Sequence, residues 1–335
     1  MTRPPSSPAS ERPLAERLAT RIREDGPLAF SAFMDAALYA PDGFYESGGS
    51  AGRRGDFLTS PEVGPLFGAV IGRALDTWWD ELGCPDPYVV VDAGAGPGTL
   101  ARSIRAAAPR CRSALRLVLV ERSAAQRAQH PSGVESRSDL PGRADVVLAN
   151  ELLDNLPFDI VEHDGSQWRE VLVGWRDGRF VEVAGRAVDL PFAGTRLPLP
   201  HTAAAWVADA RQRCQRLVVL DYTATAATIG PGWLRCYRGH ASGLDPLEDP
   251  GSRDITADVL LDFLPAPQRT SDQAAFLRAN GLDDLVREGR RIWHDRAHVA
   301  DLAALAARSR VAEAEALTDP SGLGGFTVAE WWTAP

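Results

Sequence analysis

The sequence predicts an α/β protein built on a parallel β-sheet that helices cover. Three apolar stretches carry this prediction, "YVVVDAG", "LRLVLVE" and "ADVVLANE", with helix-like stretches at 99–107 and 123–129 between them. Strands buried on both faces of a parallel sheet form continuous apolar runs, and their alternation with helices is typical of this class. The 335 residues suffice for one large domain with insertions or for two domains.

Ahead of these strands, the sequence predicts a helical N-terminal segment over residues 13–82 that follows a disordered tail at 1–12. Apolar residues at helical spacing predict three helices, over 13–25, 30–39 and 63–82. The loop at 41–62 is rich in Gly, Ser and Arg, and we expect it to contact substrate or cofactor. Residues 83–335 then form the α/β domain, with insertions at 157–195 and 222–262.

The second half of the chain changes pattern. Residues 157–195 alternate between apolar and polar positions and contain two Asp-Gly turns, which predicts an antiparallel meander. A helix over 202–213, the buried strand "RLVVLDY" and a long loop over 223–255 follow. The remaining pattern predicts helices near 256–263, 271–279 and 296–309, and an antiparallel pair of "RVAEAEAL" with "GGFTVAEWW".

Composition excludes several classes of function. The net charge of −9 argues against nucleic acid as a partner, because that binding needs basic patches. The chain has no lysine, which excludes a Schiff base and a P-loop. We expect a cytoplasmic protein that is not inserted in a membrane, since no apolar run reaches a membrane span and the four cysteines lie far apart. A homodimer is compatible with the sequence, and no metal site is expected.

The turn after the first strand, "DAGAGPGT", places glycines at every second position: Gly94, Gly96 and Gly98. A dinucleotide fingerprint, GxGxxG, would need its third glycine at Thr99. Pro97 also removes an N–H donor that a phosphate would use. The GxGxG pattern therefore favours S-adenosylmethionine (SAM), which has no pyrophosphate, over a dinucleotide.

An acid at the end of the next strand completes this pattern. Glu121 ends "LRLVLVE", where two carboxylate oxygens can accept from the two ribose hydroxyls. Asp92, just before the turn, is a candidate partner for the cofactor's ammonium group or an ordinary strand-end acid. A plain tight turn with a surface glutamate, and a nucleotide cofactor, are the alternatives.

The stretch "ANELLDNLP" follows the third apolar strand, at the carboxyl edge of the sheet where ligands bind in open α/β folds. Asn150, Glu151 and Asp154 are the candidate catalytic residues, and Asn150 is also expected near the cofactor. A carboxylate binds a guanidinium bidentately, so Glu151 and Asp154 could align an arginine nitrogen. Helix capping is the alternative for Asp154.

Further candidates lie in other loops. The predicted substrate contacts are Asp56, Glu62, Asp221 and Tyr222. For Glu62 the alternative is helix capping, and for Tyr222 it is a half-buried packing aromatic.

Several separated stretches resemble one family, the MidA-type SAM-dependent methyltransferases, which include the mitochondrial complex I assembly protein arginine methyltransferase. They are "FMDAALYAPDGFY", "GDFLTSPEVGPLFG", "DAGAGPGTLA", "LVERS", "ANELLDNLP", "LRCYRGH", "DITADV" and "DPSGLGGFTVAEW". The chain departs from the family at Asp92 and Pro97 in the glycine turn, and at Asp258 where the family has His.

The resemblance implies a class I SAM-dependent methyltransferase fold, a Rossmann-like seven-stranded sheet whose last strand is reversed. It implies N-methylation of an arginine side chain on a protein substrate. In such folds Asp139 and Leu140 fall beside the adenine, although a plain loop acid is the alternative for Asp139. The rival functions are a small-molecule methyltransferase and a non-catalytic SAM-binding assembly factor.

Overall fold

The computed structural model describes residues 13–49, 58–238, 243–299 and 301–333. The predicted disordered tail and the candidate Asp56 lie outside these residues. The chain divides into two compact units. The sheet unit comprises Ser50–Leu153, Trp206–Thr223 and Pro265–Pro335. The meander unit comprises Met1–Gly49, Asp154–Ala205 and Ala224–Leu264.

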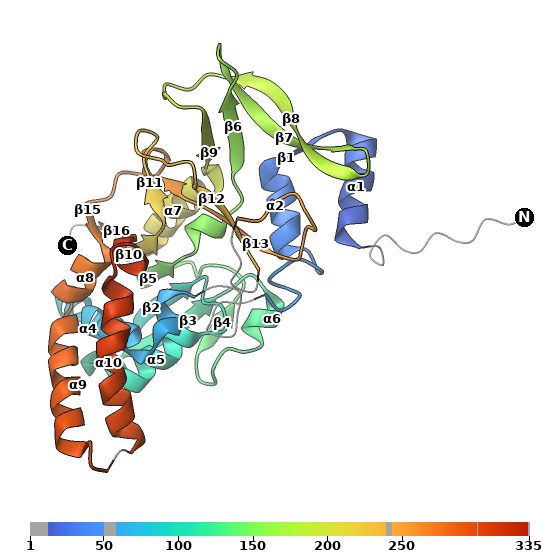
Figure 1. The fold of residues 1–335 in the computed structure, drawn as a ribbon. Helices are drawn as coiled ribbons and strands as arrows, with labels where there is room; N and C mark the ends of the chain where they lie inside the picture. Colours follow the sequence, from blue (N-terminus) through green and yellow to red (C-terminus); the bar gives the residue numbers. More distant parts are fainter. Residues whose placement is uncertain (1–12, 50–57, 239–242, 300, 334–335) are drawn as a thin grey trace, which may run out of the picture. The chain divides into compact units, whose positions relative to one another are not determined.

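A seven-stranded sheet in the order β15-β16-β10-β5-β2-β3-β4 forms the centre of the sheet unit (Figure 1). Its strands are β2 (Tyr88–Ala93), β3 (Leu115–Val120), β4 (Glu135–Arg137), β5 (Ala144–Asn150), β10 (Cys214–Asp221), β15 (Arg269–Asp272) and β16 (Thr327–Trp332). Strands β4, β3, β2, β5 and β10 run parallel, whereas β16 is antiparallel to both of its neighbours. This confirms the α/β fold with seven strands and a reversed last strand.

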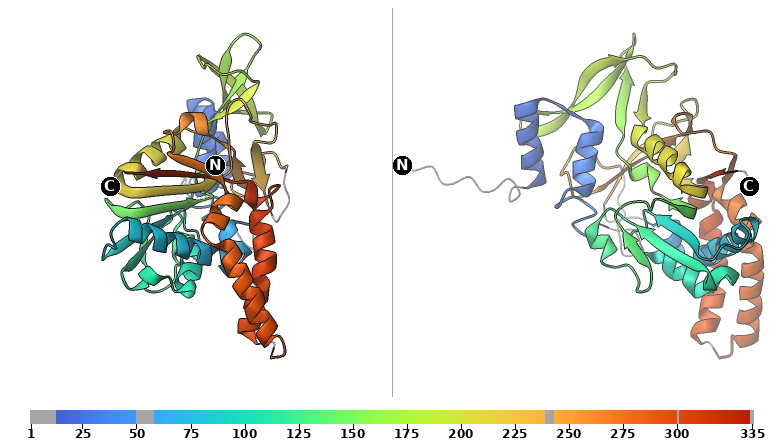
Figure 2. Two further views of the ribbon diagram at one scale, coloured as in Figure 1. Left: turned by 90° about the vertical axis from the view of Figure 1, so that its left-hand side faces the viewer. Right: turned by 180° about the vertical axis from the view of Figure 1, so that it is seen from behind.

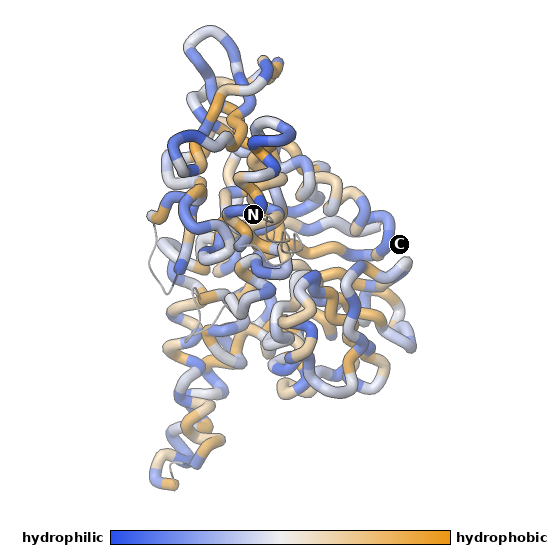
Figure 3. Tube along the Cα trace, turned by 90° about the vertical axis from the view of Figure 1, so that its right-hand side faces the viewer, coloured by the Kyte–Doolittle hydropathy of each residue, from blue (hydrophilic) through white to orange (hydrophobic). Residues whose placement is uncertain are grey.

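Helices and apolar strands build the core of this unit. Its helices are α3 (Ser60–Val63), α4 (Pro65–Glu81), α5 (Thr99–Ala107), α6 (Ala124–Arg127), α8 (Gln273–Ala279), α9 (Leu282–Arg296) and α10 (Leu302–Thr318), with 3-10 turns η2 (Arg110–Ser113) and η5 (Leu323–Gly325). Phe67 and Leu75 of α4 and Ile104 of α5 pack with Leu119 and Leu148 of the strands in one buried cluster. Figure 3 shows the strands as largely apolar segments, as a sheet covered on its faces requires.

The C-terminal part of the sheet unit corrects two predictions. The stretch "RVAEAEAL" is not a strand but lies in α10, which packs beside α9 as a hairpin (Figure 2). Ala and Glu are strong helix formers, and Asp301 caps the helix by accepting from the Ala304 N–H at 2.9 Å. Helix α9 was not predicted, and the helix expected over 296–309 begins instead at Leu302.

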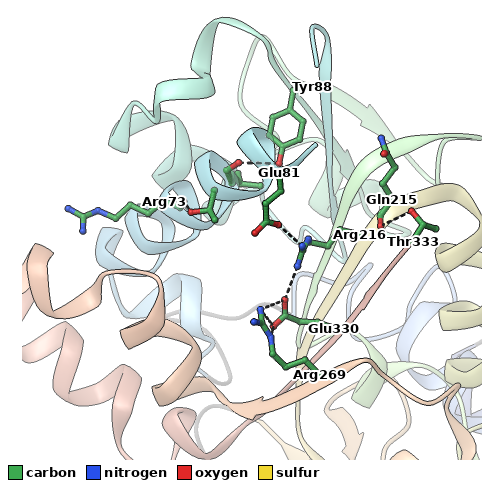
Figure 4. A network of polar contacts seen from close by, with 10 residues as sticks. Arg73, Glu81, Tyr88, Gln215, Arg216, Arg269, Glu330 and Thr333 are labelled. Atoms are coloured by element: carbon green, nitrogen blue, oxygen red, sulfur yellow. Dashed lines mark hydrogen bonds and ion pairs between the residues drawn. The ribbon is translucent and has the colours of Figure 1, made fainter. Parts of the chain in front are cut away.

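An ion network around one buried carboxylate joins the reversed strand to its neighbours (Figure 4). Glu330 on β16 is fully buried and accepts from Arg269 Nε at 2.6 Å and from Arg269 Nη2 at 2.8 Å. Arg216 on β10 donates to the same carboxylate at 3.2 Å and to Glu81 at 2.7 Å. The two guanidinium groups neutralise a carboxylate that would otherwise be costly to bury.

We expect Arg269→Ala to lower the free energy of unfolding by about 1 kcal/mol, because Arg216 still pairs with Glu330 and the lost guanidinium is half exposed. Denaturant unfolding measures this change. The control is Arg287→Ala, which removes an exposed pair with Asp284 on α9. Equal effects of the two substitutions would show that the pairing of Arg269 with the buried Glu330 stabilises the fold no more than an exposed ion pair does.

The meander unit is organised by a five-stranded antiparallel sheet. Its strands are β1 (Leu28–Ala29), β6 (Asp159–His163), β7 (Trp168–Arg176), β8 (Arg179–Val188) and β9 (Arg196–Leu199), in the order β1-β7-β6-β9 with β8 beside β7. The predicted antiparallel meander is present, and the N-terminal segment adds β1 to it. Two N-terminal helices complete this part of the unit, α1 (Leu14–Asp25) and α2 (Phe30–Tyr39).

The segment predicted as a long loop and a helix instead forms a strand pair. β12 (Leu234–Tyr237) and β13 (Asp254–Ala257) are antiparallel, with Arg235 opposite Thr256. Helix 256–263 was therefore a wrong prediction, because the apolar run is used in strand pairing that local spacing does not reveal. The remaining elements are η3 (Leu153–Asn155), α7 (His201–Arg213), β11 (Thr223–Ala224), β14 (Val259–Leu260) and η4 (Leu261–Phe263).

Candidate active site

The glycine turn lies between β2 and α5 in the sheet unit. Gly94, Gly96 and Gly98 have φ angles of +70°, +52° and +84°, in the left-handed region that glycine enters without strain. A Cβ on Gly98 would lie 2.9 Å from side-chain atoms of Leu119 and Pro131, so the turn packs closely there. At Gly96, no described atom apart from those of the adjoining residues lies within 4 Å of the Cβ position, so this side of the turn is open space.

Glu121 follows β3 directly, and its carboxylate reaches the glycine turn. One oxygen, Oε2, accepts from the Gly96 N–H at 3.1 Å, and Oε1 accepts from the Ser123 N–H at 2.7 Å. Burial raises the pKa of Glu121, while these two N–H donors oppose the rise. Each carboxylate oxygen has a second lone pair, so the pair of oxygens can still accept from two ribose hydroxyls.

Asp92, near the end of β2, is a buried carboxyl group with one oxygen free to bind a ligand. It is 3% exposed, and its Oδ2 has no hydrogen-bond partner among the described residues. Burial, with a smaller contribution from Glu121, raises the pKa of Asp92 to about 7. Buried polar atoms are normally paired, so an ammonium group would supply the partner that Oδ2 lacks. Asp92 and Glu121 therefore fit a cofactor that carries an ammonium and a vicinal diol.

The raised pKa of Asp92 predicts a pH dependence of stability in the ligand-free protein. The unfolded carboxyl has a pKa near 3.9, so the folded chain binds more protons between that value and about 7. The contribution of Asp92 therefore destabilises the fold progressively as the pH rises through this window. We expect Asp92→Asn to reduce the loss of unfolding free energy between pH 5 and pH 8, as measured by denaturant titration. An unchanged pH dependence would contradict this.

The end of β5 holds Asn150 and Glu151. The Glu151 carboxylate accepts at Oε1 from Asn150 Nδ2 at 2.9 Å and from the Ser60 N–H at 3.0 Å. Asn150 Oδ1 is buried without a partner among the described residues. The φ angle of Glu151 is +51°, a strained value for a residue with a Cβ, and its N–H donates to Leu220 at 2.8 Å. Two motifs far apart in sequence, "TSPE" and "ANEL", thus meet at this carboxylate.

Asp221 at the end of β10 stabilises that strained turn. Its Oδ2 accepts from the N–H groups of Leu152 at 3.2 Å and Leu153 at 2.8 Å, and its Oδ1 accepts from the Tyr222 N–H at 2.8 Å. The Tyr222 ring packs on Phe326, with 4.1 Å between ring centroids. Asp221 therefore supports the turn at Glu151, whereas the Tyr222 ring packs on Phe326. A direct contact of either residue with substrate remains a prediction.

Three further candidates, Asp139, Leu140 and Glu62, also lie in the sheet unit. Asp139 and Leu140 follow β4, where Asp139 is exposed and accepts from the Ser138 hydroxyl at 2.7 Å. Glu62 lies half-buried in the short helix α3, two residues after Ser60. The roles assigned to these three residues remain predictions.

Asp154 belongs to the meander unit and lies in a buried polar cluster. It is 4% exposed, its Oδ2 accepts from the Thr256 hydroxyl at 2.5 Å, and burial raises its pKa to about 6. Nearby, Asp254 accepts at Oδ1 from Asn155 Nδ2 and from the Tyr45 hydroxyl, both at 3.0 Å, and burial raises its pKa to about 7. Sequence reasoning missed Asp254, although Asp254, Tyr45 and Asn155 all lie in stretches that resemble the family.

His130 is a second residue that sequence reasoning missed. Its ring lies against the glycine turn, with Nε2 at 2.9 Å from the Gly96 carbonyl oxygen. It lies in the loop after α6, in the stretch "RAQHPSG", and no spacing pattern there marks it. The contact comes from the tertiary fold alone.

A parallel sheet with one reversed strand, a three-glycine turn after its first strand and an acid after the next define the class of SAM-dependent methyltransferases. The chain belongs to a family of S-adenosyl-L-methionine-dependent methyltransferases, whose model matches residues 70–279. Its family and its fold therefore both identify the chain as a SAM-dependent methyltransferase.

Curated relatives cover most of the chain. The mitochondrial protein arginine methyltransferase NDUFAF7 homolog of Drosophila melanogaster is 28% identical over 73% of this chain and 68% of its own length. The mitochondrial protein arginine methyltransferase NDUFAF7 of Mus musculus is 24% identical over 81% of this chain and 74% of its own. Across the described residues, no helix has the length and apolar character needed to cross a bilayer.

A solved structure agrees with the fold and the cofactor. A superfamily member from Burkholderia thailandensis, crystallised with S-adenosyl-homocysteine, is 25% identical, with a TM-score of 0.79 over 99% of this chain and 95% of that one. A second crystal structure from the same organism has a TM-score of 0.80 at 24% identity, with the same coverage of both chains. The cofactor predicted from the glycine turn and Glu121, SAM, is confirmed.

Proposed function

We propose that this protein transfers the methyl group of SAM to a side-chain nitrogen of arginine in a protein substrate. The relatives from fly and mouse are named protein arginine methyltransferases, which supports this acceptor. The observation that carries the proposal is the carboxylate of Glu151, held at the carboxyl end of β5 by Asn150 and the Ser60 N–H. When bound, the cofactor supplies an electrophilic methyl group on a sulfonium.

Glu151 would bind and align the acceptor. A guanidinium is a planar fork of N–H donors that matches the two oxygens of a carboxylate. Its pKa above 12 makes free deprotonation at neutral pH rare, so a fixed anion that orients one nitrogen and stabilises the developing charge is the useful group. The donors on Oε1 and the rigid turn at Glu151 keep this anion in place before the acceptor arrives.

We propose that the other candidate residues assist catalysis or contact the substrate and the cofactor. Asp154 would be a second catalytic carboxylate, from the same stretch "ANELLDNLP" as Glu151. The residues proposed to contact substrate are Asp56, Glu62, Asp221 and Tyr222. Those proposed to contact the adenosine are Asp139 and Leu140, with Asn150 near the methionine portion of the cofactor.

The test uses tritiated SAM with an extract of cells that lack this protein, so that its acceptor sites are unmethylated. Label in protein that acid hydrolysis releases as methylarginine would support the proposal. Label confined to small molecules would indicate a small-molecule methyltransferase. Absence of S-adenosyl-homocysteine formation in every extract, despite tight SAM binding, would indicate a non-catalytic SAM-binding assembly factor. The extract incubated with tritiated SAM but without the added protein serves as the control for contaminating activities.

A further inference from the structure

The peptide groups at Gly96 are bonded by side chains from two different segments. The Gly96 N–H donates to Glu121 Oε2 at 3.1 Å, and its carbonyl oxygen lies 2.9 Å from His130 Nε2. The neighbouring N–H groups of Gly94 and Ala95 instead donate to the carbonyl of Val120, at 2.8 and 3.1 Å. Backbone hydrogen bonds to Val120 therefore hold the start of the turn, whereas the side chains of Glu121 and His130 hold the peptide groups of Gly96 at its middle.

The His130 ring is itself held in one orientation. Its Nδ1 lies 2.8 Å from the Ser136 hydroxyl on β4. The Gly96 carbonyl can only accept a hydrogen bond, so Nε2 carries the hydrogen, and Nδ1 of the neutral ring accepts from Ser136. Burial lowers the pKa of His130 below its ordinary value, which favours the neutral ring. The arrangement thus fixes both the tautomer and the direction of the donor.

The segment around His130 also packs on the turn. A Cβ on Gly98 would lie 2.9 Å from the Pro131 ring, and Arg102 donates both to the Pro97 carbonyl at 2.8 Å and to the Gln129 carbonyl at 3.4 Å. Residues 129–131 therefore form a second support for the turn, in addition to Glu121. All of these groups belong to the sheet unit.

We propose that His130 is a positioning residue of the cofactor site, which holds the Gly96 peptide in the orientation that accepts SAM by donating from Nε2 to its carbonyl. It acts through the glycine turn and not on the methyl group. The proposal rests on the SAM cofactor and is independent of the acceptor. It can therefore fail or hold whatever the methylated substrate is.

The test compares three substitutions in the full chain by calorimetric titration with S-adenosyl-homocysteine. His130→Gln places an amide nitrogen near the position of Nε2, whereas His130→Asn places one near Nδ1 and His130→Ala removes both. We expect Ala and Asn to weaken binding roughly fivefold to tenfold, the scale of one hydrogen bond, and Gln to stay within about twofold of wild type. Circular dichroism and thermal unfolding without ligand verify the fold of each variant.

Recovery of affinity in Gln but not in Asn would support positioning by the Nε2 donor. Wild-type affinity in a folded Ala variant would overturn the proposal, as would equal losses in Gln and Asn, which would indicate simple packing of the ring. Should the Ala variant fail to fold, the comparison of Gln with Asn decides alone, because these two side chains are both polar amides. S-adenosyl-homocysteine binds without a methyl acceptor. A wrong assignment of the methylated substrate therefore cannot produce any of these results.

Discussion

Glu151→Gln is expected to lower the single-turnover rate of methyl transfer about 100-fold or more, the range for removing a group that acts on the acceptor's charge or proton. The amide keeps the shape of the side chain and an oxygen that can accept from Asn150 and the Ser60 N–H. It lacks the negative charge that we propose aligns the guanidinium. The rate is measured with excess enzyme over SAM and with the acceptor identified by the labelling experiment.

The same variant should bind S-adenosyl-homocysteine within about twofold of wild type, since a loss restricted to turnover marks an interaction made with the acceptor or in the transition state. The matched control is Glu135→Gln, which changes an exposed carboxylate on β4 that pairs with Arg137. A wild-type turnover in Glu151→Gln would remove Glu151 from the catalytic assignment. A large loss of cofactor affinity would place it in the cofactor site instead.

Glu121→Ala is expected to weaken cofactor binding by about 1.5 to 3 kcal/mol, the scale of hydrogen bonds to a charged group, or roughly 10- to 150-fold in Kd. Two effects add in the same direction. The ribose hydroxyls lose their acceptor, and the N–H groups of Gly96 and Ser123 lose the carboxylate that orders the turn. Calorimetric titration with S-adenosyl-homocysteine measures the change.

The control for this variant is Glu135→Ala, which removes the carboxylate of a neighbouring segment without touching the glycine turn. We also expect Glu121→Gln to be weakened less than Glu121→Ala, because the amide retains one acceptor oxygen. Unchanged affinity in Glu121→Ala would defeat the assignment of this residue to the ribose. An effect of the same size in Glu135→Ala would indicate a general loss of negative potential.

The parts of the fold that depend on local pattern could be predicted from the sequence. Continuous apolar runs identify β2, β3 and β5, and α5 begins and ends at the predicted residues, because a glycine turn and an αL residue at Ala108 bound it. The strand pair β12–β13 could not be predicted, since each strand is stabilised by hydrogen bonds to the other, about 20 residues away in the sequence. The helix at "RVAEAEAL" was mistaken for a strand because alternating Ala and Glu mimic a period of two while favouring a helix.

The candidate site divides in the same way. Gly94, Gly96, Gly98 and Glu121 were predicted because the turn and the strand-end acid are features of contiguous sequence. His130 of the sheet unit and Asp254 of the meander unit each make their contact with a residue of the same unit, 34 and 99 positions away, so no window of sequence contains the signal. The strained backbone at Glu151 was equally invisible, because it depends on Asp221 holding the next two N–H groups.

The most direct measurement of the central claim is a crystal structure of this protein with S-adenosyl-homocysteine. We predict both ribose hydroxyls within hydrogen-bonding distance of the Glu121 oxygens, and the amino group of the homocysteine portion beside Asp92 Oδ2. A ligand bound elsewhere, or a ribose that leaves Glu121 bonded only to Gly96 and Ser123, would contradict it.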